Sequence, residues 1–193
     1  MRVAIAQVNP VVGDLRGNRR LVEEAAARAA DARADVVVLP ELVLTGYPPM
    51  DLLLREGFVR DQIRELDALL PASKRVPILL GAVLPGEDAS PGELRNAAVL
   101  LADGRRAARQ DKTHLPSYDI FDEKRYFRAA TRRSPCELGG VPIGLTVCED
   151  SWADALGYKV NPIAELAADG ARDSGSSAPD FDQPAVNSVT FRL

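Results

Sequence analysis

The residues best suited to chemistry stand at the ends of short apolar stretches. Cys148 follows the nearly all-apolar segment 141–147 and precedes two acidic residues, Glu149 and Asp150. The turn after a rigid strand exposes a nucleophile placed there, and the next backbone N–H groups are free to bind an oxyanion. We therefore interpret Cys148 as a candidate nucleophile and the backbone N–H of Glu149 as an oxyanion donor.

A cysteine nucleophile needs one group that takes its proton and another that stabilises the oxyanion. The single histidine, His114, allows a Cys–His–acid triad, although nothing local in the sequence orients its ring. Glu41 follows the apolar run 35–39, and Lys112 follows the segment 105–110. If these strands are neighbours of the one before Cys148, Glu41 would be the general base and Lys112 would stabilise the oxyanion.

Each candidate also has an ordinary structural explanation. A cysteine at a strand end is most often a small buried hydrophobic side chain. Lys112 alone would be a solvated surface charge, Glu41 alone a capping residue, and the charged run 122–125 a solvated face.

Two further groups are interpreted as structural. Glu149, Asp150 and Asp154 would suit a magnesium site only beside a phosphate-binding loop, which is not present in the sequence, so we expect acids at a helix start. Cys136 follows Pro135 in a predicted loop and is expected to be structural or incidental.

The elements that position these residues follow from hydrophobic periodicity. The segments 2–8, 35–39, 77–83 and 141–147 have the composition of strands. The segments 96–102 and 105–110 flank Asp103-Gly104, which favours a hairpin. Helices are expected after an N-cap at Asn18, over 52–70, and over 163–168 behind Asn161-Pro162.

The order of these elements predicts an α/β fold. The first strand, helix and second strand form a βαβ unit with a right-handed crossover, so their strands run parallel. The hairpin needs antiparallel pairing as well, which indicates more strands than one purely parallel sheet would hold. The segment 112–128 is expected to be a loop.

Composition narrows the classes of partner. The 193 residues carry a formal net charge of −4, which gives no reason to expect a nucleic acid or an anionic membrane as partner. There is no apolar run near the roughly 20 residues of a transmembrane helix, and the first ten residues do not resemble a signal peptide. Two cysteines do not make a disulfide framework, so we expect a cytoplasmic chain.

Three motifs resemble the nitrilase, or carbon–nitrogen hydrolase, superfamily in order and spacing. They are LPELVLTGYP (39–48), RQDKTHLP (109–116) and LTVCEDSW (145–152). Three further stretches resemble the N-terminal glutaminase domain of glutamine-dependent NAD synthetases: AIAQVNPVVGDLRGN (4–18), TGYPPMDLLLR (45–55) and HLPSYDIFDEKRYF (114–127). The resemblance covers residues 1–171.

The resemblance implies a fold and roles for individual residues. The fold would be an α-β-β-α sandwich of the nitrilase type, incomplete at its C-terminus. Glu41 would be the base, Lys112 the oxyanion-stabilising cation, and Cys148 the nucleophile that forms a γ-glutamyl thioester and releases ammonia. Tyr118, Phe121 and Glu123 would line the pocket for L-glutamine, whose ammonium group needs a carboxylate or a carbonyl and whose stem needs apolar walls.

The resemblance also implies what the chain works with. Thioester chemistry needs no metal or organic cofactor, and ATP and deamido-NAD would belong to a synthetase domain that this chain does not include. A homo-oligomer is expected for the full-length protein. Two other functions stay open: a stand-alone amidase or nitrilase acting on another C–N substrate, and an inactive truncated remnant.

The resemblance predicts a division of the chain. Residues 1–171 would be a partial glutaminase domain, and 172–193 a divergent, loop-like or disordered tail, since RDSGSSAPDF after Ala171 has no counterpart in the family. The last third of a nitrilase fold is therefore expected to be missing.

Overall fold

A computed structural model describes residues 1–86 and 93–170 in full, and the backbone of 189–192. The strands are β1 (Val3–Ile5), β2 (Val36–Val38), β3 (Ile78–Pro85), β4 (Leu94–Ala102), β5 (Arg105–Asp111), β6 (Cys136–Leu138), β7 (Val141–Val147) and β8 (Val189–Arg192). The α-helices are α1 (Leu15–Asp31), α2 (Phe58–Ala68), α3 (Glu123–Tyr126) and α4 (Pro162–Ala168). Three 3₁₀ turns complete the set: η1 (Met50–Leu54), η2 (Ala72–Lys74) and η3 (Cys148–Trp152).

The first sheet has the strand order β1-β2-β3-β4-β5. Strands β1, β2 and β3 run parallel, and α1 connects the first two, which confirms the predicted βαβ unit. Strands β3, β4 and β5 pair antiparallel. The hairpin turn at Asp103-Gly104 is also confirmed, and both residues have positive φ, of 54° and 75°.

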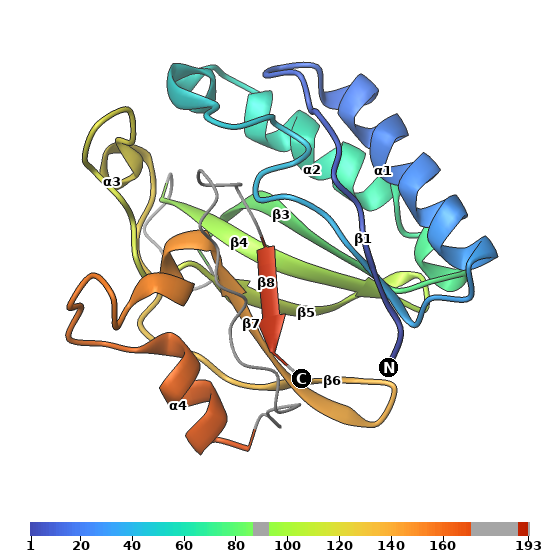
Figure 1. Ribbon diagram of the computed structural model, residues 1–193. Helices are drawn as coiled ribbons and strands as arrows, with labels where there is room; N and C mark the ends of the chain where they lie inside the picture. The colour runs from blue at the N-terminus through green and yellow to red at the C-terminus, as the bar shows by residue number, and fades with distance from the viewer. Residues whose placement is uncertain (87–92, 171–188, 193) are drawn as a thin grey trace.

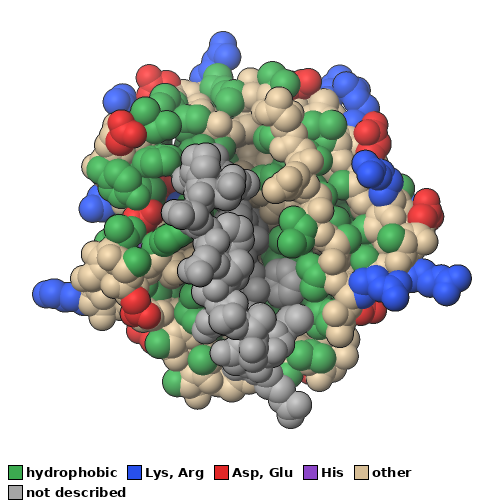
Figure 2. Space-filling view, viewed as in Figure 1, with side chains coloured by type: hydrophobic (Ala, Val, Ile, Leu, Met, Phe, Trp, Pro, Cys, Tyr) green, Lys and Arg blue, Asp and Glu red, His purple; other side chains and the backbone are tan. Residues whose placement is uncertain are grey.

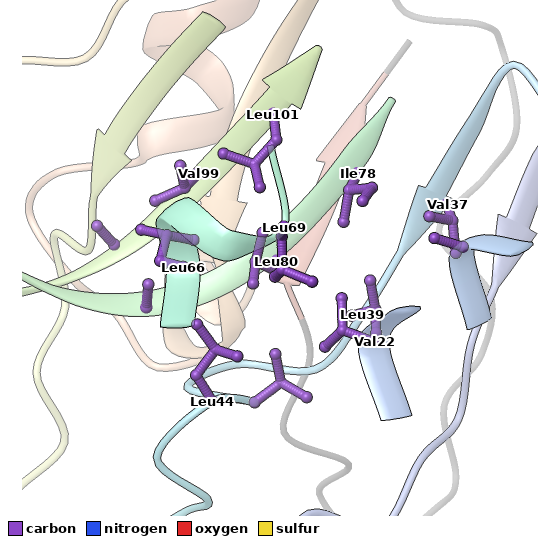
Figure 3. Close-up of a cluster of buried hydrophobic side chains, with 14 of the residues drawn as sticks. Val22, Val37, Leu39, Leu44, Leu66, Leu69, Ile78, Leu80, Val99 and Leu101 are labelled. Atoms are coloured by element: carbon purple, nitrogen blue, oxygen red, sulfur yellow. The ribbon is translucent and has the colours of Figure 1, made fainter. Parts of the chain in front are cut away.

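Helices cover one face of this sheet. Figure 1 shows α1 and α2 together on that side, and Figure 3 shows side chains from both helices pointing at side chains of the sheet. Val22 of α1 and Leu66 of α2 are fully buried, and they pack in one cluster with Ile78, Leu80 and Val99. Burying each such side chain stabilises the fold by roughly 1.5–3 kcal/mol.

The other face packs against a second, shorter sheet with the order β6-β7-β8. A separate apolar cluster joins the two sheets, and we call it the inter-sheet cluster. Its buried members are Val36, Val38, Leu79, Ala98 and Leu100 from the first sheet and Leu138, Ile143, Leu145 and Val147 from the second.

Helix α4 packs on β7. A Cβ atom added at Gly144 of β7 would lie 3.1 Å from Cβ of Leu166, so the helix sits close against that strand. In Figure 1, β6, β7 and α4 lie on the opposite side of the first sheet from α1 and α2. The architecture is mixed α/β, and a full sandwich is not evident from the described residues.

Two helix predictions need correction. The N-cap of α1 is Asp14, whose carboxylate accepts from the N–H of Gly17, and not Asn18. Asn18 lies inside the helix, and its side chain binds the backbone of Val11 and Leu44 instead of capping the helix. The helix predicted over 52–70 is broken into η1 and α2, since the chain turns through Gly57 at a φ of 81°.

Two loop predictions also need correction. Cys136 begins strand β6, which pairs with β7, and is not in a loop. Residues 189–192 of the predicted loop-like tail form β8, antiparallel to β7, while 171–188 and 193 lie outside the described residues. Across the described ranges, no helix has the length and apolar content needed to cross a bilayer.

Candidate active site

Glu41 is held at the end of β2 by a close approach to β3. A Cβ atom added at Gly81 of β3 would lie 2.6 Å from Cα of Glu41 and 2.3 Å from the backbone nitrogen of Leu42. The N–H of Gly81 also donates to the carbonyl of Pro40. Only glycine lets the turn that carries Glu41 lie directly on the strand.

Lys112 follows β5 and is bound to two buried carboxylates. Its Nζ lies 2.8 Å from Oε1 of Glu41 and 2.9 Å from Oε1 of Glu123. The side chains of Lys112 and Glu41 have no exposed surface. Burial alone would lower the pKa of Lys112, but Glu41, Glu123 and Cys148 outweigh it and raise this pKa. Lys112 is therefore a fixed cation.

Asn96 of β4 orients the Glu41 carboxylate. Its Nδ2 donates to Oε1 of Glu41 at 2.5 Å and lies 3.5 Å from Oε2 of Glu123. Among the described residues, Oε2 of Glu41 has no hydrogen-bond partner although it is buried. One carboxylate oxygen is thus used for anchoring, and the other is free to take a proton.

Glu123, the first residue of α3, completes the buried cluster. Its Oε1 also accepts from the hydroxyl of Tyr47 at 2.8 Å. Burial and the nearby charge of Glu41 raise the pKa of Glu123 to about 7, against the opposing effects of Lys112 and Tyr47. Glu123, which is expected from the sequence in the substrate pocket, has its carboxylate bonded to Lys112 and also lines a cavity.

Cys148 is the first residue of η3, directly after β7, and its φ of 44° is in the left-handed region. A non-glycine residue in this conformation costs of order 1–3 kcal/mol and needs support from its surroundings. Burial is the main reason that the pKa of Tyr47 and that of Tyr118 are raised, and Cys148 raises both further. Cys148 also raises the pKa of Lys112. Its sulfur therefore lies close enough to interact electrostatically with Tyr47, Tyr118 and Lys112.

The carboxylate of Glu149 accepts from two tyrosine hydroxyls. Oε2 accepts from Tyr118 at 3.0 Å, and Oε1 accepts from Tyr158 at 2.8 Å. Glu149 is only 4% exposed, whereas Tyr118 is 51% exposed. A buried negative charge therefore lies beside Cys148, at the point where the site meets the surface.

The sequence matches the family model for carbon-nitrogen hydrolases over residues 2–168. The chain belongs to the carbon-nitrogen hydrolase family. Among curated relatives, the glutamine-dependent NAD(+) synthetase of Thermotoga maritima is 37% identical over 177 residues, which span 87% of this chain and 30% of that protein. The chain thus spans about a third of the length of such relatives.

Solved structures agree with the family assignment. A glutamine-dependent NAD+ synthetase from Acinetobacter baumannii, in complex with ADP, matches with a TM-score of 0.76 and 32% identity, over 86% of this chain and 30% of that one. An amidase from Nesterenkonia sp. AN1 matches with a TM-score of 0.65 and 26% identity, over 78% of this chain and 56% of that one. In that structure the acetamide moiety of fluoroacetamide is covalently added at the active-site cysteine.

A cavity of about 240 Å³ lies beside the buried cluster in this carbon-nitrogen hydrolase. The loop around Tyr47 and Pro48 forms one wall, and Phe121 and Glu123 contribute to the other. Tyr118 packs edge-on against Phe121, with ring centroids 5.6 Å apart. Of the residues expected in a pocket, Phe121 and Glu123 thus line this cavity, and Tyr118 contacts Phe121.

His114 takes part in packing. Its Nε2 lies 2.9 Å from the carbonyl oxygen of Val160, and its ring stacks on Tyr158 with centroids 3.9 Å apart. These contacts give the ring a structural role in holding the segment 158–160. In the described ranges, no group of three or more His, Cys, Asp or Glu residues could hold a metal ion.

Sequence reasoning missed Tyr47 and Asn96. The signal for Asn96 was a single polar residue at the start of the apolar segment 96–102, where a buried amide needs a partner. Tyr47 stands in the stretch 45–55, which indicated a resemblance to the glutaminase domain but no role for this side chain.

Proposed function

We propose that this chain is the glutaminase part of a glutamine-hydrolysing NAD synthetase, which cleaves the side-chain amide of L-glutamine and releases ammonia. The observation that carries the proposal is the buried Lys112–Glu41 ion pair, with Oε2 of Glu41 left unbonded. Cys148 supplies the third group at the end of β7. A base, a fixed cation and a thiol are what amide cleavage through a thioester needs.

In the first half of the reaction, Oε2 of Glu41 takes the thiol proton of Cys148 as the sulfur attacks the amide carbon. The C=O π electrons move to oxygen, and Nζ of Lys112 and the backbone N–H of Glu149 stabilise the oxyanion. Removing one such donor typically costs about 10²–10³-fold in rate. When the tetrahedral intermediate collapses, Glu41 gives its proton to the leaving nitrogen, the C–N bond breaks and ammonia departs.

In the second half, a water molecule hydrolyses the thioester. Glu41 takes a proton from the water, and the hydroxide attacks the carbonyl carbon of the γ-glutamyl thioester. A second oxyanion forms against the same donors. The C–S bond then breaks, glutamate leaves, and the thiol of Cys148 recovers its proton from Glu41. General base catalysis of this kind contributes about 10²–10⁴-fold.

Recognition of glutamine would use the residues around the cavity. Phe121, which lines the cavity, and Tyr118, which packs on Phe121, would offer aromatic surface to the methylene stem, and Glu123 would contribute the buried carboxylate that is paired with Lys112. Glu149 suits the substrate's α-ammonium group, because its carboxylate is held by two tyrosines where the site meets the surface. An ammonium group would pair with this buried charge.

The wider assignment draws on the curated relatives, which are glutamine-dependent NAD(+) synthetases. In a longer protein of this kind, the ammonia would amidate deamido-NAD with ATP in a synthetase domain. The second sheet and α4 would then be part of a complete α-β-β-α sandwich, and the full-length protein would be a homo-oligomer.

The test is ammonia release from glutamine by the purified chain, compared with Cys148→Ala and Cys136→Ala. The Cys148→Ala variant should lose ammonia release and the covalent glutamyl adduct that rapid quenching and mass spectrometry detect. Cys136→Ala should keep both, because Cys136 lies in β6. Ammonia release that survives in Cys148→Ala would remove Cys148 from the mechanism.

The similarity to a solved amidase favours one alternative, hydrolysis of a simpler amide. The same three side chains would carry out the same chemistry on it. Turnover of acetamide or propionamide at a higher kcat/KM than glutamine would support that alternative. Loss of glutamine turnover in Glu149→Gln, with acetamide turnover unchanged, would support glutamine.

A further inference from the structure

We propose that Asp150 is a positioning residue that fixes Lys112 and Cys148 relative to each other. The inference rests on the proposed function, because it concerns the placement of two groups to which that function gives roles. Asp150 is 1% exposed, and both of its carboxylate oxygens accept backbone N–H groups.

The contacts of Asp150 reach two different strand ends. Its Oδ1 accepts from the N–H of Thr113 at 3.0 Å and from that of His114 at 2.8 Å. Its Oδ2 accepts from the N–H of Val147 at 3.2 Å. Thr113 and His114 directly follow Lys112, and Val147 directly precedes Cys148.

The two strand ends belong to different sheets. Lys112 follows β5, in the first sheet, and Cys148 follows β7, in the second. The apolar contacts of the inter-sheet cluster are non-directional, so they do not by themselves fix how two particular strand ends are placed. Hydrogen bonds are directional. Because one carboxylate accepts them from both strand ends, they fix the position of the backbone at Lys112 relative to the backbone at Cys148.

An ordinary helix cap does not account for these contacts. A cap on η3 explains the bond to Val147, which lies three residues before Asp150. It does not explain the two bonds to Thr113 and His114, which come from the other sheet. The turn that Val147 and Asp150 close also contains Cys148, whose φ of 44° needs such support.

The test compares Asp150→Asn with Asp154→Asn in the full 193-residue chain. Asparagine keeps the shape of aspartate but has only one side-chain oxygen. Its NH2 group must therefore face the N–H groups of one of the two strand ends and cannot accept hydrogen bonds from them. Asp154 is an exposed acid four residues later in the chain and accepts from Asn161, so its variant makes the same change of charge without touching either strand end.

The readout is the rate at which iodoacetamide alkylates Cys148, followed by peptide mass spectrometry between about pH 6 and 10. Cys136 in the same chain is an internal reference, because burial raises its pKa to about 11. In Asp150→Asn we expect alkylation of Cys148 to slow by about 10- to 100-fold near neutral pH, which is the scale of a misplaced reacting group.

The sign of the change separates positioning from charge. Loss of a nearby negative charge alone would lower the pKa of Cys148 and speed alkylation near neutral pH. Slower alkylation in Asp150→Asn, with Asp154→Asn like the wild type and both variants melting cooperatively, supports the proposal. Alkylation at the wild-type rate or faster overturns it, and so does loss of cooperative melting in Asp150→Asn, because Asp150 would then support the whole fold.

Failure of the proposed function would look different. Ammonia release from glutamine is measured on the wild-type chain in parallel. Its absence would count against glutamine as substrate, whereas alkylation needs no glutamine and still reports on the placement of Cys148.

Discussion

Nζ of Lys112 lies 2.8 Å from Oε1 of Glu41, and neither side chain is exposed to solvent. The two residues are far apart in the sequence and follow different strands, so the contact depends on the folded sheet. Placing both charges in the interior is costly unless each is paired. This pair is therefore central to both the stability and the proposed chemistry of the chain.

Replacing Lys112 by Met should destabilise the fold by about 3–5 kcal/mol, because two buried carboxylates would lose their cation. Ammonia release should also be lost. Urea unfolding of the variant measures the first effect. The matched control is Arg106→Met, which breaks a half-exposed pair with Asp67 and should cost less than about 1 kcal/mol. Equal losses in the two variants would contradict the buried pair's importance.

Glu123 should make stability depend on pH. Its pKa is raised from 4.5 in the unfolded chain to about 7 in the folded one, first by burial and then by Glu41. In this window the folded chain holds a proton that the unfolded chain has released, so this contribution to stability is lost as the pH rises from 4.5 to about 7.

The variant Glu123→Gln removes that contribution. We expect the free energy of unfolding of the wild type, relative to the variant, to be larger at about pH 5 than at about pH 8. Urea titrations at both pH values measure the difference. A difference that does not change with pH would show that Glu123 titrates alike in both states.

Asn96→Leu should lower the kcat/KM for glutamine by about 10- to 100-fold, because the Glu41 carboxylate loses one of its two anchors and can rotate. Leucine has a similar size, so the fold should remain. The control is Gln62→Leu, which removes another buried amide, one that accepts from the N–H of Val83. Gln62→Leu should lose stability and keep kcat/KM, and the reverse pattern would refute the role of Asn96.

Gly81→Ala should destabilise the chain by about 1–3 kcal/mol or more and reduce ammonia release, because the added methyl group would overlap the backbone of Glu41 and Leu42. Thermal melts and activity assays together check this. Gly144→Ala is the comparison in β7, where the new atom would meet the movable side chain of Leu166. It should be the milder change of the two.

His114→Gln should change ammonia release by less than the roughly 10²-fold that loss of a general base would cost. The reason is that the imidazole contacts Val160 and Tyr158. Steady-state kinetics with glutamine measure the effect. A fall of about 10²-fold or more in kcat, with a melting temperature unchanged, would restore His114 as a candidate base.

Much of the fold was predictable where one local signal was strong. The apolar segment before Cys148 did form β7, Asp103-Gly104 did form a hairpin, and Asn161 did cap α4. These features depend on residues close together in the sequence. The break at Gly57 was missed because apolar spacing continues across it, although the backbone there needs positive φ.

The residues of the candidate site also fall into those that the sequence indicated and those that only the folded structure shows. Strand ends pointed to Glu41 and Lys112, and the structure brings these two into contact. The partners of Glu123 could not be inferred, because a charged run such as DEKR is usually solvated and only the packing of α3 buries its second acid. Asn96 and Asp150 were missed as site residues for the same reason, since each acts through atoms distant in the sequence.

The inter-sheet cluster has a consequence for the chemistry. Glu41 and Lys112 follow strands of the first sheet and Cys148 follows a strand of the second, so the inter-sheet cluster joins the two sheets that carry the base and the thiol. Replacing Leu79 or Leu145 of the inter-sheet cluster by alanine would let the two sheets move relative to each other, although every reacting side chain would still be present. Activity would then be lost at temperatures below the melting temperature of the chain. The temperature at which activity is lost would therefore depend on the packing of the inter-sheet cluster.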